Sequence, residues 1–435
     1  MKRILIKDAK QSAGKKVAVG AWVQTIRHQG KIIFLVLRDV TGTMQAVAFE
    51  SSVVEQVDEL TLESVVSVKG LVKEAKQAPG GIEIEVEKLD VLSSAEPELA
   101  IPVVEKSGDE THQEKRLDWR WLDLRKPHKQ LILRAWTKLS EGFREYWISN
   151  EYIEVHTPKL MGTASESGAE VFKVQYFEGE AYLAQSPQFY KQMAMAAGLE
   201  RVFEVGPVFR AEPSFTTRHV TEFTGYDFEI SFIDSYEEVM GELENSLIAG
   251  LTKVKAGLGD AIKADHGADV VIPDKPFPRV TMAEAKAKLA AAGVRGEKPD
   301  DVSPEEERAL CNLIKKETGH EFVFLTEYPV SSRPFYHMRF EDRPEITKSF
   351  DLLWKGVEIS TGAQREHRYD VLVKQAKEKK MDLKALQFYL DFFRYGCPPH
   401  GGVGIGPARI MMKIFESENI REVTFLPRTV KRLRP

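Results

Sequence analysis

Cysteine is scarce in this chain. Its 435 residues include two cysteines, Cys311 and Cys397. Two thiols are too few for a disulfide framework or for a zinc site made of cysteines, and they fit a reducing compartment. We therefore expect two ordinary free thiols.

Long apolar runs are missing as well. No run of about 18 apolar residues, the length that a membrane-spanning helix needs, occurs in the sequence. The first residues, MKRILIKDAKQ, contain no apolar segment of the signal-peptide type. These absences predict a cytoplasmic protein without a membrane partner.

A strong net charge is also absent. The chain carries 61 basic and 66 acidic residues, a net charge of −5, with 43% hydrophobic and 29% charged residues. This composition is typical of a soluble globular protein and argues against bulk, non-specific binding of nucleic acid, although it leaves a local basic face open. The length exceeds that of one ordinary core, so we expect two or three domains.

Residues 1–95 have the pattern of a small β-rich domain. Apolar residues alternate or run together in five short segments, at 17–23, 32–37, 44–49, 65–72 and 82–86. Five short strands predict a small closed barrel of the oligonucleotide-binding (OB) type. The residues expected on or beside one of its faces are Arg27, His28, Phe34 and Gln45. There Phe34 could stack on a single-stranded base, or it could belong to the core.

Residues 96–127 differ in character from the barrel segment. They combine prolines and charges with little apolar periodicity, which predicts a linker, followed by a second domain over residues 128–435. In that domain the pattern predicts helices at 130–149, 237–257, 282–292 and 303–318, and strands at 152–158 and 322–328. A further helix would carry Gln188 and Lys191 on one face, although a lysine on a helix face usually points to water.

Residues 204–232 have the clearest chemical character. Two extended runs flank a polar loop; the entering run ends in Arg210 and Glu212, which would share one face of a strand. Asp227 and Glu229 share a face of the returning run in the same way. A polar face turned to water is the plain alternative for either pair. An arginine, a histidine and an aromatic around one hairpin instead favour a nucleotide, because guanidinium matches phosphate oxygens and a ring offers a flat face to a purine.

Two later stretches add acids and glycines. In the first, Asp351 and Glu358 lie on an expected strand pair, and acids of this kind near phosphates commonly hold magnesium. In the second, a glycine loop over residues 401–406 leads into a helix that starts near Pro407. This loop lacks the Gly-Lys-Ser/Thr of a Walker motif, and no strand with GxGxxG indicates a dinucleotide fold.

Together these stretches resemble the class II aminoacyl-tRNA synthetases, and most closely the aspartyl-tRNA synthetases. The similar motifs are FRAE and TTRHVTEF, then GVEISTGAQR, then GIGPAR and REVTFLPRTVKRLRP, in this order behind an N-terminal barrel. The resemblance covers essentially the whole chain. It implies an α+β fold, with an OB-fold barrel that reads the anticodon and a catalytic domain built on an antiparallel sheet flanked by helices. It also implies a homodimer, whose interface motif is matched by Phe143 to Pro158, and the shorter archaeal or eukaryotic type of chain.

The resemblance assigns an ATP site by position. The residues that match are Arg210, Glu212, Arg218, His219, Phe223, Glu358 and Arg409. Arg210 would grip the α-phosphate, and Glu212 would contact the adenine amino group. Phe223 and Arg409 would sandwich the adenine ring. The catalytic residues would be Arg210, Glu358 and Arg409.

Further positions follow from the same resemblance. Arg218 and His219 resemble contacts to the outer phosphates. Glu358 would bind Mg²⁺ together with Thr361, which stands where the family commonly has serine.

The resemblance also assigns an aspartate site. The matching residues are Glu166, Gln188, Lys191, Asp227, Thr361 and Arg365. Lys191 and Arg365 match a cationic pair for the side-chain carboxylate, and neutral asparagine would leave both cations unpaired. Asp227 and Gln188 match residues that hold the ammonium group, while Glu166 sits in the loop that closes on it.

The chain departs from the family pattern in three places. The closing loop reads Glu166-Ser167-Gly168 where Glu-Gly-Gly is common. The acid that usually precedes Arg409 is replaced by Ala408. The segment Pro213-Ser214-Phe215 differs from the usual Asn/His-containing version, at the place where the acceptor end of tRNA would approach.

The barrel positions imply an anticodon site. They are Arg27, His28, Phe34, Gln45, Pro79 and Glu83. In the family, a histidine in the first barrel loop and a proline in a later loop accompany relaxed reading of the last anticodon base, which separates tRNA-Asp from tRNA-Asn. His28 and Pro79 match that pair and imply a non-discriminating enzyme, with two plain loop residues as the alternative.

The implied activity is that of an aspartate–tRNA ligase. The α-carboxylate of aspartate would attack the α-phosphorus of ATP, pyrophosphate would leave, and the aspartyl group would pass to the terminal ribose of tRNA. The alternatives are an asparaginyl-tRNA synthetase on the same scaffold, an amino-acid ligase without the barrel, and an RNA-binding paralogue. The paralogue should lack Arg210, Glu358 or Arg409, which are all present.

Overall fold

The computed structural model describes residues 2–105, 110–163, 170–213 and 216–435 of the chain. It divides into two compact units, residues 1–130 and residues 131–435. Among the described residues, no helix combines the length and the apolar character that crossing a bilayer requires.

The first unit contains the predicted barrel. Its strands are β1 (Lys16–Gln29), β2 (Ile32–Asp39), β3 (Gly42–Ala48), β4 (Val65–Glu74) and β5 (Ile82–Ser93), joined in the order β1-β2-β3-β5-β4. Alternate side chains of these strands fill the interior, so that Ile33 and Leu35 are buried while Phe34 between them is half-buried. The OB-fold prediction is confirmed, and Phe34 lies outside the core cluster.

Short helices complete this unit. They are α1 (Ile6–Ala9), α2 (Ser51–Asp58), α3 (Gln113–Asp118) and α4 (Arg120–Asp123). The last two fall within the predicted linker and enclose a buried ion network. Asp123 accepts a 2.7 Å hydrogen bond from Arg120 and lies 3.1 Å from the ammonium group of Lys126. This stretch therefore has its own packed structure, in addition to connecting two domains.

The second unit is built on a mixed sheet of eight described strands. Its order is β12-β13-β14-β15-β16-β11-β10-β6. The bounds are β6 (Ile153–Glu154), β10 (Arg201–Phe209), β11 (Glu222–Ser231), β12 (Arg279–Thr281), β13 (Phe322–Thr326), β14 (Ser349–Trp354), β15 (Val357–Arg365) and β16 (His400–Ile405). The central pairs are antiparallel, and the two edge pairs are parallel. The predicted α+β class is confirmed, with these parallel edges added.

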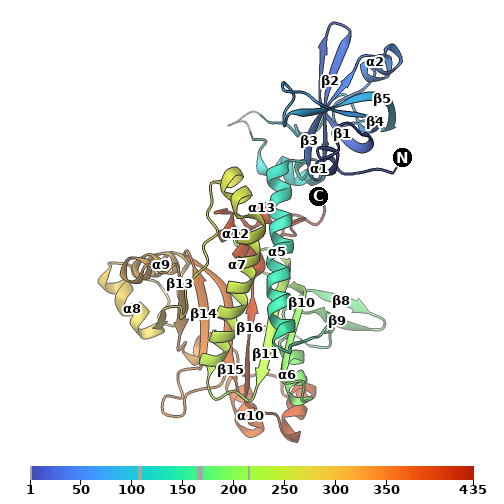
Figure 1. Cartoon of the computed structure of the whole chain (residues 1–435). Helices are drawn as coiled ribbons and strands as arrows, with labels where there is room; N and C mark the ends of the chain where they lie inside the picture. The colour runs from blue at the N-terminus through green and yellow to red at the C-terminus, as the bar shows by residue number, and fades with distance from the viewer. Residues whose placement is uncertain (1, 106–109, 164–169, 214–215) are drawn as a thin grey trace. The chain divides into compact units, whose positions relative to one another are not determined.

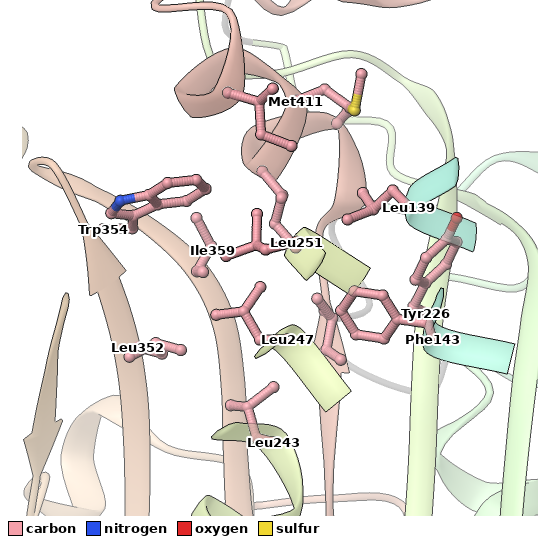
Figure 2. Close-up of a cluster of buried hydrophobic side chains, with 14 of the residues drawn as sticks. Leu139, Phe143, Tyr226, Leu243, Leu247, Leu251, Leu352, Trp354, Ile359 and Met411 are labelled. Atoms are coloured by element: carbon pink, nitrogen blue, oxygen red, sulfur yellow. The ribbon is translucent and has the colours of Figure 1, made fainter. Parts of the chain in front are cut away.

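One face of this sheet is covered by two long helices. Helices α5 (Pro127–Ser149) and α7 (Tyr236–His266) run alongside each other in Figure 1. Their apolar side chains meet those of the sheet, including Phe143 of α5, Leu247 of α7 and Tyr226 of β11, and Figure 2 shows this packing. Helix α7 begins with a capping box at Ser235 and ends at Gly267 in the left-handed conformation, which explains why it is longer than predicted.

The opposite face carries the polar residues of the hairpin. In β11, Tyr226 and Phe228 point into the apolar core, so Asp227 and Glu229 point away from it. Helix α6 (Gln188–Ala196) contacts β10 and β11 and supplies Lys191 to this face. The charged residues therefore lie between a helix and a sheet, and the open alternative of a solvent-facing polar strand is wrong for this pair.

Smaller elements surround this core. They are β7 (Leu160–Met161), β8 (Lys173–Tyr176) and β9 (Gly179–Leu183) in a three-stranded sheet, helices α8 (Met282–Ala291), α9 (Pro304–Thr318), α10 (Tyr369–Glu378), α11 (Gln387–Asp391), α12 (Pro407–Ile414) and α13 (Ile420–Val423), and the 3-10 helices η1 (Val330–Ser332) and η2 (Phe392–Tyr395). Helices α8 and α9 begin with capping boxes and share an apolar cluster with β12, β13 and β14.

Two local predictions were wrong. The expected strand over 152–158 is limited to β6, and the expected glycine loop over 401–406 forms strand β16. Glycine is needed in β16 because its neighbours approach closely: a Cβ on Gly401 would lie 2.7 Å from the carbonyl oxygen of Ala363, and one on Gly402 would meet the carboxylate of Glu229.

Candidate active site

A cavity of about 390 Å³ opens on the polar side of the large sheet. Its walls come from the β10–β11 hairpin, the start of α6, the segment before β14, strand β15 and the start of α12. The predicted site residues that line it are Gln188, Arg210, Glu212, Arg218, His219, Phe223, Asp227, Glu358, Thr361, Arg365 and Arg409. Chain segments almost two hundred residues apart, such as those of Arg210 and Arg409, therefore form one site.

Arg210 and Phe223 meet at the base of the hairpin. Strand β10 ends at Phe209, so Arg210 and Glu212 lie just beyond the strand on which they were expected. The guanidinium carbon of Arg210 nevertheless lies 5.5 Å from the centre of the Phe223 ring, and Arg210 is 3.9 Å from Glu212. This arrangement puts a cation, an acceptor and an aromatic face side by side.

His219 connects the hairpin loop to α12. Its Nε2 lies 3.4 Å from Nη2 of Arg409, and its Nδ1 lies 2.6 Å from the hydroxyl of Thr216. Because arginine can only donate, Nε2 accepts and the proton sits on Nδ1. Burial, followed by the positive charge of Arg409, lowers the pKa of His219, in agreement with a neutral ring.

A β-bulge in β15 orients the carboxylate of Glu358 toward the guanidinium of Arg409. The register between β14 and β15 shifts so that Ile359 is left unpaired and points into the core. Glu358 and Thr361 then reach the same side of the strand, where the Thr361 hydroxyl donates a 3.0 Å hydrogen bond to Glu358. Arg409 donates to the backbone oxygen of Glu358 and lies 3.5 Å from its carboxylate.

This corner has the donor chemistry of a magnesium site. Glu358 and Thr361 offer a carboxylate and a hydroxyl, which are hard oxygen ligands. Among the described residues, no group of three or more His, Cys, Asp or Glu side chains forms a metal cage. Mg²⁺ is usually held by one or two carboxylates together with phosphates and water, so the residues present fit it.

Arg218 is bound to an acid on another helix. It donates a 2.6 Å hydrogen bond to Glu307 of α9 and a 3.0 Å bond to the backbone oxygen of Gly356. Burial and the nearby charge of Glu358 raise the pKa of Glu307 to about 7, against the opposing effect of Arg218. Arg218 thus lines the cavity but is directed to the α9 side of it.

Lys191 lies beneath the other end of the cavity. Its ammonium group donates to Asp227 at 2.9 Å and to the backbone oxygen of Val403 at 3.1 Å, and it lies 3.4 Å from Glu229. The side chain is 1% exposed. The solvated alternative for this lysine is therefore wrong, and burial without a carboxylate partner would be too costly.

Arg365 completes this end. It donates to Glu229 at 2.9 Å, to the backbone oxygen of Gly402 at 2.9 Å, and to Nε2 of His337 at 3.0 Å. Burial raises the pKa of Asp227 despite Lys191, whereas Arg365 and Lys191 together outweigh burial at Glu229 and lower its pKa. Two cations and two carboxylates thus alternate in a buried network.

Three residues of this site were not assigned from the sequence. Glu229 was seen to share a face with Asp227, but its place between two cations was not predicted. His337 and Glu307 come from segments that carried no functional signal beyond their composition. Of the predicted residues, Glu166 lies outside the described residues, as do Ser167, Gly168, Ser214 and Phe215.

The predicted anticodon residues lie on neighbouring strands of the barrel. Arg27 of β1 and Phe34 of β2 are cross-strand partners, with the guanidinium carbon 4.8 Å from the ring centre. Gln45 of β3 donates a 2.7 Å hydrogen bond to Glu83 of β5. The exposed His28 lies 3.6 Å from Asp58 of α2, and Pro79 is exposed in the β4–β5 connection.

Comparison with known proteins gives the family. Residues 112–430 match the tRNA synthetases class II (D, K and N), and residues 17–92 match the OB-fold nucleic acid binding domain. The aspartate–tRNA(Asp/Asn) ligase of Aeropyrum pernix is 42% identical over 439 residues, which cover 99% of this chain and 98% of that protein. The chain belongs to the aspartate–tRNA ligase family. Class II aminoacyl-tRNA synthetases use ATP with a divalent metal ion.

Other aspartate–tRNA ligases and their structural neighbours agree with this placement. The aspartate–tRNA(Asp) ligase of Pyrococcus abyssi is also 42% identical, over 97% of each chain. A solved aspartyl-tRNA synthetase from Entamoeba histolytica has a TM-score of 0.87 and 33% identity, and covers 100% of this chain and 93% of its own. The asparaginyl-tRNA synthetase of Pyrococcus horikoshii, complexed with asparaginyl-adenylate, has a TM-score of 0.92 and 34% identity over 100% of both chains. The scaffold is therefore shared by enzymes for both amino acids.

Proposed function

We propose that this chain activates L-aspartate with ATP and transfers the aspartyl group to the 3′ end of tRNA-Asp. The observation that carries the proposal is the buried network at the closed end of the cavity, where Lys191 and Arg365 both contact Glu229. Two cations with fixed carboxylate partners suit a substrate that brings one ammonium and two carboxylate groups. Asparagine would bring a neutral amide in place of the second carboxylate.

The amino-acid site works by complementary charge. Lys191 and Arg365 bind the side-chain carboxylate of aspartate, while Asp227 and Gln188 bind its ammonium group. Thr361, which lines the cavity, and Glu166, which lies outside the described residues, complete the proposed aspartate site. The α-carboxylate is left facing the hairpin, where the reaction takes place.

The ATP site works by placing cations around the phosphates. Arg210 binds the α-phosphate and stabilises the charge that develops on it during in-line attack. Phe223 and Arg409 hold the adenine ring between them, and Glu212 accepts from its amino group. The 5.5 Å contact between the guanidinium of Arg210 and the ring of Phe223 supports this arrangement, because it places the residue proposed for the α-phosphate next to the residue proposed for adenine.

Two further contacts act on the outer phosphates. His219 and Arg218 take this role from the loop between β10 and β11. Glu358 and Thr361 would hold Mg²⁺, which would offset the charge of the phosphates.

The barrel reads the anticodon of the tRNA. Phe34 stacks on one base, and Arg27 and Gln45 bond to base edges, with Glu83 fixing Gln45. His28 and Pro79 relax the reading of the last anticodon base, so that tRNA-Asn is charged as well. The named relatives include ligases for tRNA(Asp) and ligases for tRNA(Asp/Asn) at the same sequence identity. This agrees with a discrimination between the two tRNAs that depends on few residues.

The functional unit is a homodimer in the cytoplasm. The end of α5 and strand β6 form the interface, since Ile148 and Ile153 there are 62% and 46% exposed. Ile148 lies near the end of α5 and Ile153 on the edge strand β6, and burial of these exposed apolar side chains against a partner would support the interface.

The test is aspartate attachment to purified tRNA-Asp and tRNA-Asn transcripts, with asparagine as the control amino acid. Charging of both tRNAs with aspartate would support the whole proposal and make His28 and Pro79 the next residues to substitute. Charging of tRNA-Asp alone would support the proposed ligase activity but would contradict relaxed reading of the last anticodon base. Attachment of asparagine in preference to aspartate, or no activity at all, would contradict the proposal in favour of an asparaginyl enzyme or an RNA-binding paralogue.

A further inference from the structure

His337 contacts the arginine of the amino-acid site from a segment that the sequence did not single out. It lies between η1 and β14, is 3% exposed, and lines the cavity. Its backbone forms an isolated antiparallel bridge with Arg365, and its carbonyl oxygen accepts a 3.1 Å hydrogen bond from Gln375 of α10. The ring is therefore fixed beside Arg365 by its own backbone.

The hydrogen bond to Arg365 determines the form of the ring. Nε2 of His337 lies 3.0 Å from Nη1 of Arg365. A guanidinium group has no acceptor, so Nε2 must supply its lone pair and the proton of the neutral ring must sit on Nδ1. Burial, and then the charges of Arg365, Arg333 and Lys379, lower the pKa of His337 well below its usual value, which agrees with this form.

A neutral acceptor has a particular advantage at this place. Arg365 donates to acceptors that include, among the described residues, the carboxylate of Glu229, the backbone oxygen of Gly402 and the ring of His337. Glu229 orients the guanidinium and also cancels part of its charge. His337 and Gly402 orient it without cancelling charge, so the positive potential remains for a substrate carboxylate.

We propose that His337 is a positioning residue for amino-acid selection. As a neutral imidazole with its proton on Nδ1, it fixes the guanidinium of Arg365 in the orientation that receives the side-chain carboxylate of aspartate, and it increases the preference for aspartate over asparagine. This inference rests on the proposed function of Arg365 in binding aspartate.

The experiment compares three substitutions at this position in the full chain. His337→Gln keeps an acceptor near the place of Nε2, His337→Asn is polar but too short to reach Arg365, and His337→Leu removes the acceptor. ATP–pyrophosphate exchange gives KM for aspartate, KM for ATP, and kcat/KM for aspartate and asparagine. The matched control is His320→Leu, because His320 also bonds through both ring nitrogens, to the backbone oxygens of Phe322 and Asp274 outside the cavity.

The expected result separates positioning from folding. His337→Asn and His337→Leu should raise KM for aspartate about tenfold or more, the effect of losing one hydrogen bond to a charged group, with KM for ATP within about twofold. They should also lower the ratio of kcat/KM for aspartate over asparagine, while His337→Gln restores most of both values and His320→Leu changes neither.

Equal KM values for aspartate in the Gln and Asn variants would overturn the inference, and so would an unchanged discrimination ratio in both the Asn and Leu variants. If the His337→Leu variant fails to fold, the comparison of KM for aspartate between His337→Gln and His337→Asn still tests the inference. Failure of the unsubstituted chain to activate aspartate would contradict the proposed function itself, which is a different outcome.

Discussion

Arg218 of the β10–β11 connection donates a 2.6 Å hydrogen bond to Glu307 of α9. The two residues are 89 positions apart, and both side chains are largely buried, at 16% and 10% exposed. Arg218 is proposed to bind the outer phosphates of ATP. The acid and the triphosphate therefore compete for the same cation.

Replacement of Glu307 by Gln should strengthen ATP binding. The neutral amide holds Arg218 less firmly, so we expect KM for ATP to fall by about threefold to tenfold, as for the loss of a partly buried ion pair. The measurement is ATP–pyrophosphate exchange at saturating aspartate. Glu305→Gln removes the same charge from an exposed position in the same turn of α9 and should leave KM unchanged. A higher KM in the Glu307 variant would show that this acid orients Arg218 for ATP instead of competing for it.

The same competition should depend on pH. Burial raises the pKa of Glu307 to about 7, so the acid is mostly ionised at pH 8 and mostly protonated at pH 6. Its hold on Arg218 is therefore weaker at pH 6, and KM for ATP of the unsubstituted chain should fall relative to that of Glu307→Gln as the pH is lowered through 7. Parallel pH profiles of the two proteins would contradict this, because groups other than Glu307 titrate equally in both.

Lys191→Met should greatly weaken aspartate binding. The substitution removes one of two cations from a buried network and leaves Asp227 without its 2.9 Å partner. We expect KM for aspartate to rise by about a hundredfold or more and the free energy of unfolding to fall by about 3 to 5 kcal/mol. Exchange kinetics and thermal unfolding measure the two effects. Lys173→Met, in which a 61% exposed lysine is lost, should change neither value.

Local sequence pattern predicted which neighbours share a face of a strand, whereas the roles of the site residues came from the family resemblance. That pattern placed Asp227 beside Glu229. It left Phe34 open between the core and an outer face, and the structure places this ring outside the core cluster of the barrel. The pattern could not reveal the bulge at Ile359, because the segment GVEIST has no residue that marks an irregular strand. Glu358 and Thr361 would lie on opposite faces of a regular strand, so their 3.0 Å contact depends on that irregularity.

Contacts between distant segments could not be predicted from the local sequence pattern. Arg218 and Glu307 meet because α9 packs against the sheet, and His337 meets Arg365 through an isolated bridge outside the named strands. The glycines of β16 were read as a loop because glycine is rare inside strands. Glycine is needed in this strand because Glu229 approaches Gly402 closely, and that approach exists only in the folded sheet.

Two glycines of α7 should respond oppositely to the same substitution. A Cβ at Gly250 would lie 2.6 Å from the ring of Phe143 on α5, whereas a Cβ at Gly241 would meet nothing within 4 Å. Gly250→Ala should lower the free energy of unfolding by about 1 to 3 kcal/mol through overpacking, and Gly241→Ala should raise it by up to about 1 kcal/mol through helix propensity. Chemical denaturation measures both. A loss of stability in both variants would mean that α7 does not tolerate a side chain at either position for a reason other than contact with α5.

Phe34→Ala should separate tRNA recognition from amino-acid activation. Phe34 is half-buried on the outer side of β2, with Arg27 against its ring, and stacking of a base on such a ring is worth about 1 to 3 kcal/mol. We therefore expect KM for tRNA-Asp to rise by about tenfold to a hundredfold in the charging reaction. ATP–pyrophosphate exchange, which needs no anticodon, should be unchanged. Phe49→Ala removes a 46% exposed ring that lies outside the predicted anticodon set and should leave both reactions as they are. If charging and exchange fell together in the Phe34 variant, the ring would act through the stability of the barrel, and the anticodon face would have to be sought elsewhere on it.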